Sequence, residues 1–152
     1  MVYLDQAATS FPKLDVVKQA VMDALEVAGN ANRSSNMDSS RLIFEARRNI
    51  ARFFGLSDFH RVILNGGNTE SLNTCIKGIL KEKDHVITTY AEHNSVLRPL
   101  YELEEKGVIS LTICSPYLKD IKNHIRNNTR MVIMTHSSNV TGEIFDVDLI
   151  GK

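Results

Sequence analysis

The sequence predicts an α/β fold in which a mostly parallel sheet is covered by helices. From residue 58 onward, short apolar runs alternate with stretches that carry apolar residues at helical spacing. The short runs are apolar throughout, which is typical of parallel strands that are buried on both faces. No linker separates the elements, so the alternation favours one layered α/β arrangement preceded by helices.

Length and composition narrow the class of protein. The 152 residues suit a single domain, made of an N-terminal segment with two helices (1–57) and an α/β layer (58–152). Lys plus Arg and Asp plus Glu number 18 each, so no basic excess indicates a nucleic acid partner. No apolar run approaches the roughly 20 residues of a membrane span, and the start lacks the pattern of a signal peptide. We expect a cytoplasmic protein with no membrane partner.

The N-terminal segment contains two predicted helices. The spacing of apolar residues predicts the first over 13–29, with Pro12 in its first turn and a glycine at its end. Residues 30–40 are polar and rich in turn formers, so we expect a loop. The second helix is predicted over 40–55, with Gly55 as its stop.

The α/β layer alternates regularly. The predicted strands are 61–65, 85–90, 108–114 and 130–136, and the predicted helices are 69–84, 95–107 and 117–128. Pro99 is expected to start or kink the second of these helices. Cys75 and Cys114 fit apolar faces of their elements, so we expect both in the core.

The loop "NGGNTES" between the first predicted strand and its helix has the composition of an anion site. A helix N-terminus carries unpaired N–H groups and a partial positive charge. Gly66 and Gly67 permit close approach of the backbone to a ligand, and Asn68 and Thr69 offer side-chain donors. The alternative is a capped turn, with Asn68 or Thr69 as the N-cap.

Two further polar loops follow predicted strands. His93, in "AEHNS", can stack on a ring or move protons; the alternative is an exposed loop histidine. Asn139, in "SSNVTGE", can donate to a ligand oxygen; the alternative is an Asn/Gly turn. Because parallel strands end at one edge of a sheet, the loops together favour a binding site there. The remaining histidines lack metal-ligand spacing, so no metal site is predicted: His60, His85, His124 and His136.

Five stretches of the chain resemble, in order, motifs of aminotransferase class V, and within it of the cysteine desulfurase and selenocysteine lyase family. They are "YLDQAATSFPK", "GNANRSSNMDSSRLIFEARRNIARFF", "LNGGNTESLN", "AEHNSVLRPL" and "THSSNVTGEI". The resemblance extends over all 152 residues. It implies the N-terminal part of the large domain of PLP-dependent transferases of fold type I.

The resemblance also implies a cofactor and a reaction. Pyridoxal 5'-phosphate (PLP) would serve to remove sulfur or selenium from cysteine or selenocysteine, leaving alanine. Asn68 and Thr69 would hold the phosphate. His93 would stack on the ring and assist proton transfers, and Asn139 would bind the phenolic oxygen. The substrate side would be lined by Ala7 and Ala8.

The sequence also departs from the family pattern. Gln6 stands where the family usually has Asn, and Asn68 where Ala is frequent. The family's lysine that holds PLP and its nucleophilic cysteine belong to later segments, so we expect a truncated chain that is inactive alone. The alternative is a non-catalytic remnant that binds phosphate or PLP, or that self-assembles. We expect a homo-oligomer such as a homodimer, or a complementing C-terminal chain.

The same resemblance implies that strand 61–65 lacks its partner. We therefore expect it either to pair within the remaining sheet or to be covered in a homodimer.

Overall fold

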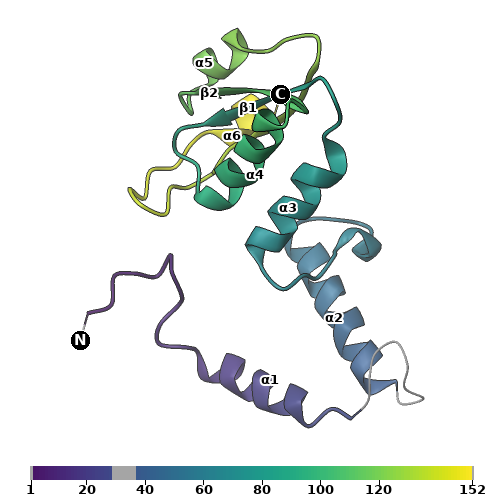
Figure 1. The fold of residues 1–152 in the computed structure, drawn as a ribbon. Helices are drawn as coiled ribbons and strands as arrows, with labels where there is room; N and C mark the ends of the chain where they lie inside the picture. The colour runs from purple at the N-terminus through teal and green to yellow at the C-terminus, as the bar shows by residue number, and fades with distance from the viewer. Residues whose placement is uncertain (1, 29–36, 152) are drawn as a thin grey trace. The chain divides into compact units, whose positions relative to one another are not determined.

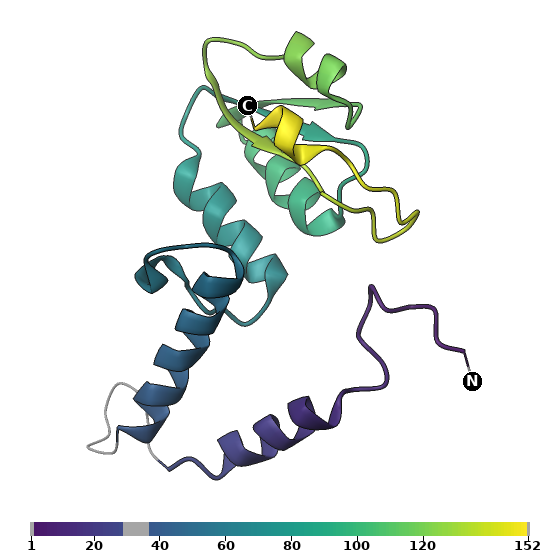
Figure 2. The same ribbon diagram turned by 180° about the vertical axis from the view of Figure 1, so that it is seen from behind.

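The structure is a computed structural model that describes residues 2–28 and 37–151 (Figures 1 and 2). The chain divides into two compact units, 1–64 and 65–152, which we describe separately. The expected organisation as a single domain stays a prediction. Within the described residues, no helix combines the length and apolar character that crossing a membrane requires.

The first unit begins with helix α1 (Asp15–Leu25), which is shorter than predicted. Its N-cap is Leu14, so Pro12 lies before the helix and not in its first turn. The predicted end at Gly29 and most of the predicted loop (30–36) lie outside the described residues. No side chain of α1, all of which are described, is buried in this structure.

Helix α2 (Asp38–Phe53) confirms the second predicted helix, although it begins two residues earlier than expected. It ends as predicted at Gly55, whose φ of +67° favours glycine. The Leu56 N–H donates to the Ala51 carbonyl at 2.8 Å, which closes the last turn. A 3-10 turn, η1 (Phe59–Arg61), follows.

The predicted strand over 61–65 is wrong. The Asp58 side chain accepts a hydrogen bond from the His60 N–H and starts η1, which ends at Arg61. Residues 62–65 then pair with no strand of the described chain. Only Val62 is buried, and the Ile63 side chain is 75% exposed. An apolar run forms a strand only when a neighbour accepts its hydrogen bonds, and no described segment does so here.

The second unit contains a sheet of three parallel strands, as predicted. These are β1 (Asp84–Thr89), β2 (Ile109–Cys114) and β3 (Thr129–Ile133), in the order β2-β1-β3. Asp84 pairs with Ile109 at one end of the β1–β2 ladder and Thr89 with Cys114 at the other. The central strand is buried from its second residue onward.

Four helices accompany the sheet: α3 (Asn68–Ile79), α4 (Asn94–Glu105), α5 (Leu118–Asn123) and α6 (Val147–Ile150). Pro99 lies inside α4, which has already begun at Asn94, so it does not start that helix. Helix α5 ends five residues before the predicted boundary. There the Arg126 N–H donates to Thr129 Oγ1 at 2.7 Å, which turns the chain into β3.

Two small cores cover opposite faces of the sheet, because successive strand residues point to opposite sides. Val86 packs with side chains of α3 and α4, whereas Ile87 packs with Cys114 of β2 and Ile121 of α5. Figures 1 and 2 show α4 and α5 on the two sides of the sheet. The prediction of a parallel sheet covered by helices is therefore confirmed.

The two cysteines differ in their environment. Cys114 is buried as predicted, but Cys75 is exposed, so that part of the prediction is wrong. Helix α3 packs against α4 through the side that carries Leu72 and Ile76, and Cys75 lies off that side.

Candidate functional site

The loops after β1 and β3 lie side by side, because these strands are parallel neighbours. The Glu92 carboxylate joins them. Its Oε1 accepts hydrogen bonds from Thr89 Oγ1, at 3.1 Å, and from the Thr135 backbone N–H. Burial raises the pKa of Glu92 despite these two donors. The loop that carries His93 is thus tied to the segment that leads to Asn139.

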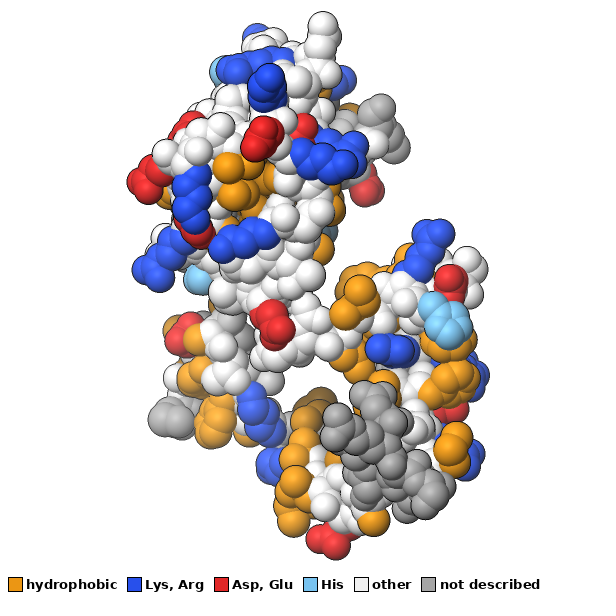
Figure 3. Space-filling model, turned by 45° about the vertical axis from the view of Figure 1, so that its right-hand side comes forward, with side chains coloured by type: hydrophobic (Ala, Val, Ile, Leu, Met, Phe, Trp, Pro, Cys, Tyr) orange, Lys and Arg blue, Asp and Glu red, His pale blue; other side chains and the backbone are white. Residues whose placement is uncertain are grey.

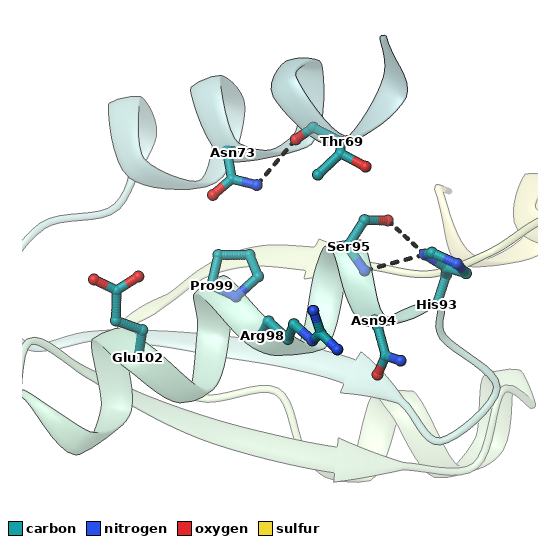
Figure 4. A pocket seen from close by; sticks show the side chains of 8 residues that line it. All are labelled: Thr69, Asn73, His93, Asn94, Ser95, Arg98, Pro99 and Glu102. Atoms are coloured by element: carbon teal, nitrogen blue, oxygen red, sulfur yellow. Dashed lines mark hydrogen bonds between the residues drawn. The ribbon is translucent and has the colours of Figure 1, made fainter.

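His93 is the N-cap of α4, a role that the sequence reading did not foresee. Its Nδ1 accepts a hydrogen bond from the Ser95 backbone N–H at 3.1 Å and lies 2.9 Å from Ser95 Oγ (Figure 4). Because Nδ1 accepts from a backbone N–H, the neutral ring carries its proton on Nε2. No described residue binds Nε2, so its N–H is available to a ligand.

The head of α3 leaves several donors unused. Its N-cap is Gly67, not Asn68 or Thr69, so the capping alternative for those two side chains is wrong. The first helical hydrogen bond runs from the Ser71 N–H to the Gly67 carbonyl at 3.1 Å. The backbone N–H groups of the three residues between them therefore lie outside the hydrogen bonds of the helix.

One carboxylate already lies near this helix end. Glu70 Oε2 accepts from the Gly66 N–H at 2.7 Å. This contact engages the loop before the helix and leaves the N–H groups of Asn68 and Thr69 unpaired within the described chain.

His93 lines two pockets. The first, of about 370 Å³, lies between α3 and α4 and includes Thr69 of α3 (Figure 4). The second, of about 450 Å³, lies beside the loops after the three strands and includes Asn139. His93 and Asn94 line both pockets. His93 thus shares one pocket with Thr69 and the other with Asn139, while Asn68 lines neither pocket.

Asn139 lies in a tight turn, as the alternative reading expected, and its side chain also lines the second pocket. Ser138 Oγ accepts from the N–H groups of Val140, at 3.3 Å, and Thr141, at 3.2 Å. Gly142, with φ of +74°, donates to the Ser138 carbonyl at 2.9 Å. This turn holds Asn139 in place, and no described residue pairs with its side chain.

The second pocket has an aromatic wall that the sequence reading missed. Tyr117 and Phe145 meet edge to face, with ring centroids 6.3 Å apart. The Tyr117 hydroxyl donates to Glu143 Oε1 at 2.8 Å, and this bond raises the pKa of Tyr117. Tyr117 follows β2, which ends at the same edge of the sheet as β1 and β3. Its place just after a predicted strand is the sequence signal that could have identified it as a pocket residue.

Ala7 and Ala8 belong to the first unit, where they form an exposed turn. Their place on the substrate side stays a prediction. The neighbouring Gln6 binds Phe11 through both ends of its amide: Nε2 donates to the Phe11 carbonyl at 2.7 Å, and Oε1 accepts from the Phe11 N–H at 3.0 Å.

Comparison with known proteins shows a consistent set of relatives. The family Aminotransferase class-V matches residues 2–152. The cysteine desulfurase IscS of Buchnera aphidicola subsp. Schizaphis graminum is 35% identical over 99% of this chain and 41% of its own length. The chain thus spans about two fifths of that relative.

Solved structures show the same relationship. The apo cysteine desulfurase from Thermococcus onnurineus NA1 superposes with a TM-score of 0.82 at 28% identity, over 99% of this chain and 40% of that one. SspA in complex with cysteine superposes with a TM-score of 0.86 at 26% identity, over 99% and 46% respectively. The chain belongs to the aminotransferase class-V family and corresponds to the N-terminal part of its cysteine desulfurases.

Proposed function

We propose that this chain provides the phosphate-binding and ring-binding part of a PLP site in a cysteine desulfurase-like protein. The chain matches Aminotransferase class-V over residues 2–152, and its resemblance to the motifs of that family implies PLP as the cofactor. The observation that carries the proposal is the position of His93, which lines one pocket with Thr69 and a second with Asn139. A small planar ligand with an anionic end would place that end in one pocket and its ring in the other, on either side of the residues that the two pockets share.

The unused donors fit this cofactor. The N–H groups at the head of α3 and Thr69 Oγ1 would bind phosphate oxygens, as helix N-termini commonly do. His93 would lie against the ring, and Asn139 would donate to its phenolic oxygen. Asn68 would contribute its backbone N–H, because its side chain lines neither pocket.

The proposed reaction is removal of sulfur or selenium from cysteine or selenocysteine, which leaves alanine. PLP supplies the electron sink for such chemistry when it is bound. The chain's own part is to orient the cofactor and to move protons at His93 Nε2, whose tautomer is set by the bond from Ser95. Ala7 and Ala8 would border the substrate.

Turnover would require more than these 152 residues, because they span 41% of the relative's length. We therefore propose that the chain is inactive alone and that turnover needs a complementing chain that carries the remaining segments, whereas a homo-oligomer of the chain would stay inactive. Light scattering of the purified chain, alone and with a candidate partner, distinguishes these two arrangements.

Equilibrium titration with PLP, followed by quenching of tyrosine fluorescence, tests the proposed site. Wild type should saturate, and Thr69→Ala, His93→Ala and Asn139→Ala should each weaken binding by about tenfold, the effect of losing one such contact. The matched control is Thr74→Ala, on the same helix but outside both pockets. Binding that does not saturate, or equal affinity of all variants, would contradict the proposal.

A further inference from the structure

Arg98 places a guanidinium in the pocket between α3 and α4. It lies on α4 four residues after Asn94, and both side chains line that pocket. Figure 4 shows the Arg98 side chain extending along the helix toward Asn94. Among the described residues, none forms a hydrogen bond or an ion pair with this guanidinium.

Among the described residues, Glu102 is the only acidic side chain that lines this pocket, and it is paired with two lysines. It accepts from Lys77 Nζ at 2.9 Å and from Lys106 Nζ at 2.5 Å. Hydrogen bonds from Lys106 and Lys77 lower the pKa of Glu102 to about 2. An Arg98–Glu102 pair, which their i,i+4 spacing would allow, does not form. Two lysines for one carboxylate leave the lysine–glutamate cluster with a net positive charge.

The remaining side chains near Arg98 include further donors. Thr69 Oγ1 and the Asn94 amide are unpaired within the described chain, whereas Ser95 Oγ is engaged by His93. Asn73 donates its amide N–H to the Thr69 carbonyl at 2.9 Å, which fixes its orientation. A cation accompanied by unpaired donors and no free carboxylate is complementary to an anion.

We propose that Arg98 is a phosphate-binding residue of this site and contacts the phosphate ester of the ligand together with Thr69. The inference rests on the proposed function and extends it, because it assigns the phosphate to the pocket between α3 and α4 and the ring to the second pocket. A guanidinium binds two phosphate oxygens at once, which an ammonium group cannot do in the same planar geometry. Sequence motifs did not indicate Arg98.

The test compares Arg98→Gln and Arg98→Lys with the control Arg130→Gln, an exposed arginine on β3 outside both pockets. Affinities are measured by calorimetry for PLP, pyridoxal, inorganic phosphate and cysteine. Arg98→Gln should weaken PLP and phosphate by about tenfold or more, typical of losing a charged hydrogen-bond partner, with Arg98→Lys between. Pyridoxal affinity should not change, and Arg130→Gln should match wild type.

The outcomes separate this inference from the proposed function. If PLP binds and His93→Ala weakens it but Arg98→Gln does not, the role of Arg98 is wrong and the proposed site stands. If PLP does not bind but phosphate binding depends on Arg98, the cofactor assignment is wrong and the anion site stands. If Arg98→Gln weakens only cysteine, the guanidinium serves a carboxylate and the phosphate assignment is overturned. Absence of phosphate and PLP binding to wild type also overturns it.

Discussion

Glu92 shows how a single residue can organise the proposed site, because it joins two loops that carry candidate ligand-binding residues. Its carboxylate lies between the ends of β1 and β3 and accepts from Thr89 and Thr135. His93 is the next residue along the chain, and Asn139 follows Thr135 by four residues. The positions of the two ligand-facing side chains therefore depend on one half-buried acid.

We expect Glu92→Ala to lower the free energy of unfolding by about 1–3 kcal/mol, because the Thr135 N–H loses its acceptor. Glu92→Gln should lose less, since its amide oxygen accepts the same bonds. Urea denaturation of the three proteins provides the measurement, and Glu82→Ala, an exposed acid before β1, is the control. Equal losses for the Ala and Gln variants would show that the acceptor oxygen is unimportant.

For single residues, the sequence predicted which polar side chains lie near the site better than it predicted what those side chains contact. The sequence predicts roles for His93, Thr69 and Asn139 because these polar residues follow apolar runs, and in the structure each of the three lines one or both of two pockets that share His93 and Asn94. Arg98, Tyr117 and Glu92 were not selected. Their importance depends on contacts between segments far apart in the sequence, such as Tyr117 with Glu143, which no local pattern encodes.

At the scale of elements, β1 is the centre of the second unit and contains a buried histidine. His85 lies 2.8 Å from Thr129 Oγ1 through Nδ1 and 2.9 Å from Thr112 Oγ1 through Nε2. These contacts join β1 to both neighbouring strands. Burial, followed by the charges of Arg126 and His124, lowers the pKa of His85 below its usual 6.5.

This shift predicts a loss of stability in acid. Because the folded chain binds a proton at His85 less readily than the unfolded chain, the free energy of unfolding is highest above pH 6.5. It should decrease as the pH falls from there toward the lower folded pKa. His85→Asn should flatten that decrease, and the exposed control His60→Asn should keep it. Urea denaturation from pH 5 to 8 measures the free energy of unfolding of wild type and of both variants. If this free energy depends on pH in His85→Asn as it does in wild type, the argument is contradicted.

The predicted strands formed where an apolar run in the sequence also has a strand neighbour or a covering helix in the fold. Strands form in the predicted ranges 85–90 and 108–114, and the predicted range 130–136 forms one only as Thr129–Ile133; each run finds a parallel neighbour or a helix to cover it. The run at 62–64 has the same composition but no strand neighbour in the described chain, so it forms none. An apolar run in the sequence indicates that a segment can form a strand. Whether a strand forms depends on a neighbouring strand with which its backbone can pair.

At the scale of the whole molecule, many apolar side chains remain at the surface. Examples are Val16 and Leu25 of α1, which are 72% and 74% exposed. Figure 3 shows such side chains in orange among charged ones. Within the described residues, β2 and β3 each have a strand neighbour on one side only. These surfaces support the proposed assembly with another chain, since exposed strand edges pair readily.

The side chains proposed to bind the cofactor all lie in one unit. All four belong to residues 65–152, so their arrangement does not require the first unit: Thr69, His93, Arg98 and Asn139.

The family assignment was available from the sequence because five motifs occur in order. The side-chain geometry was not, because it depends on how α3, α4 and the loops after the strands converge.

Titration of the isotopically labelled full chain with PLP, followed by two-dimensional NMR of backbone amides and the His93 imidazole, tests the central claim most directly. Saturable shifts should be largest at Asn68, Thr69, His93 and Asn139. Residues of α5, which lines neither pocket, should change little. Shifts that do not saturate, or that gather elsewhere on the chain, would contradict the claim that these residues form one cofactor site.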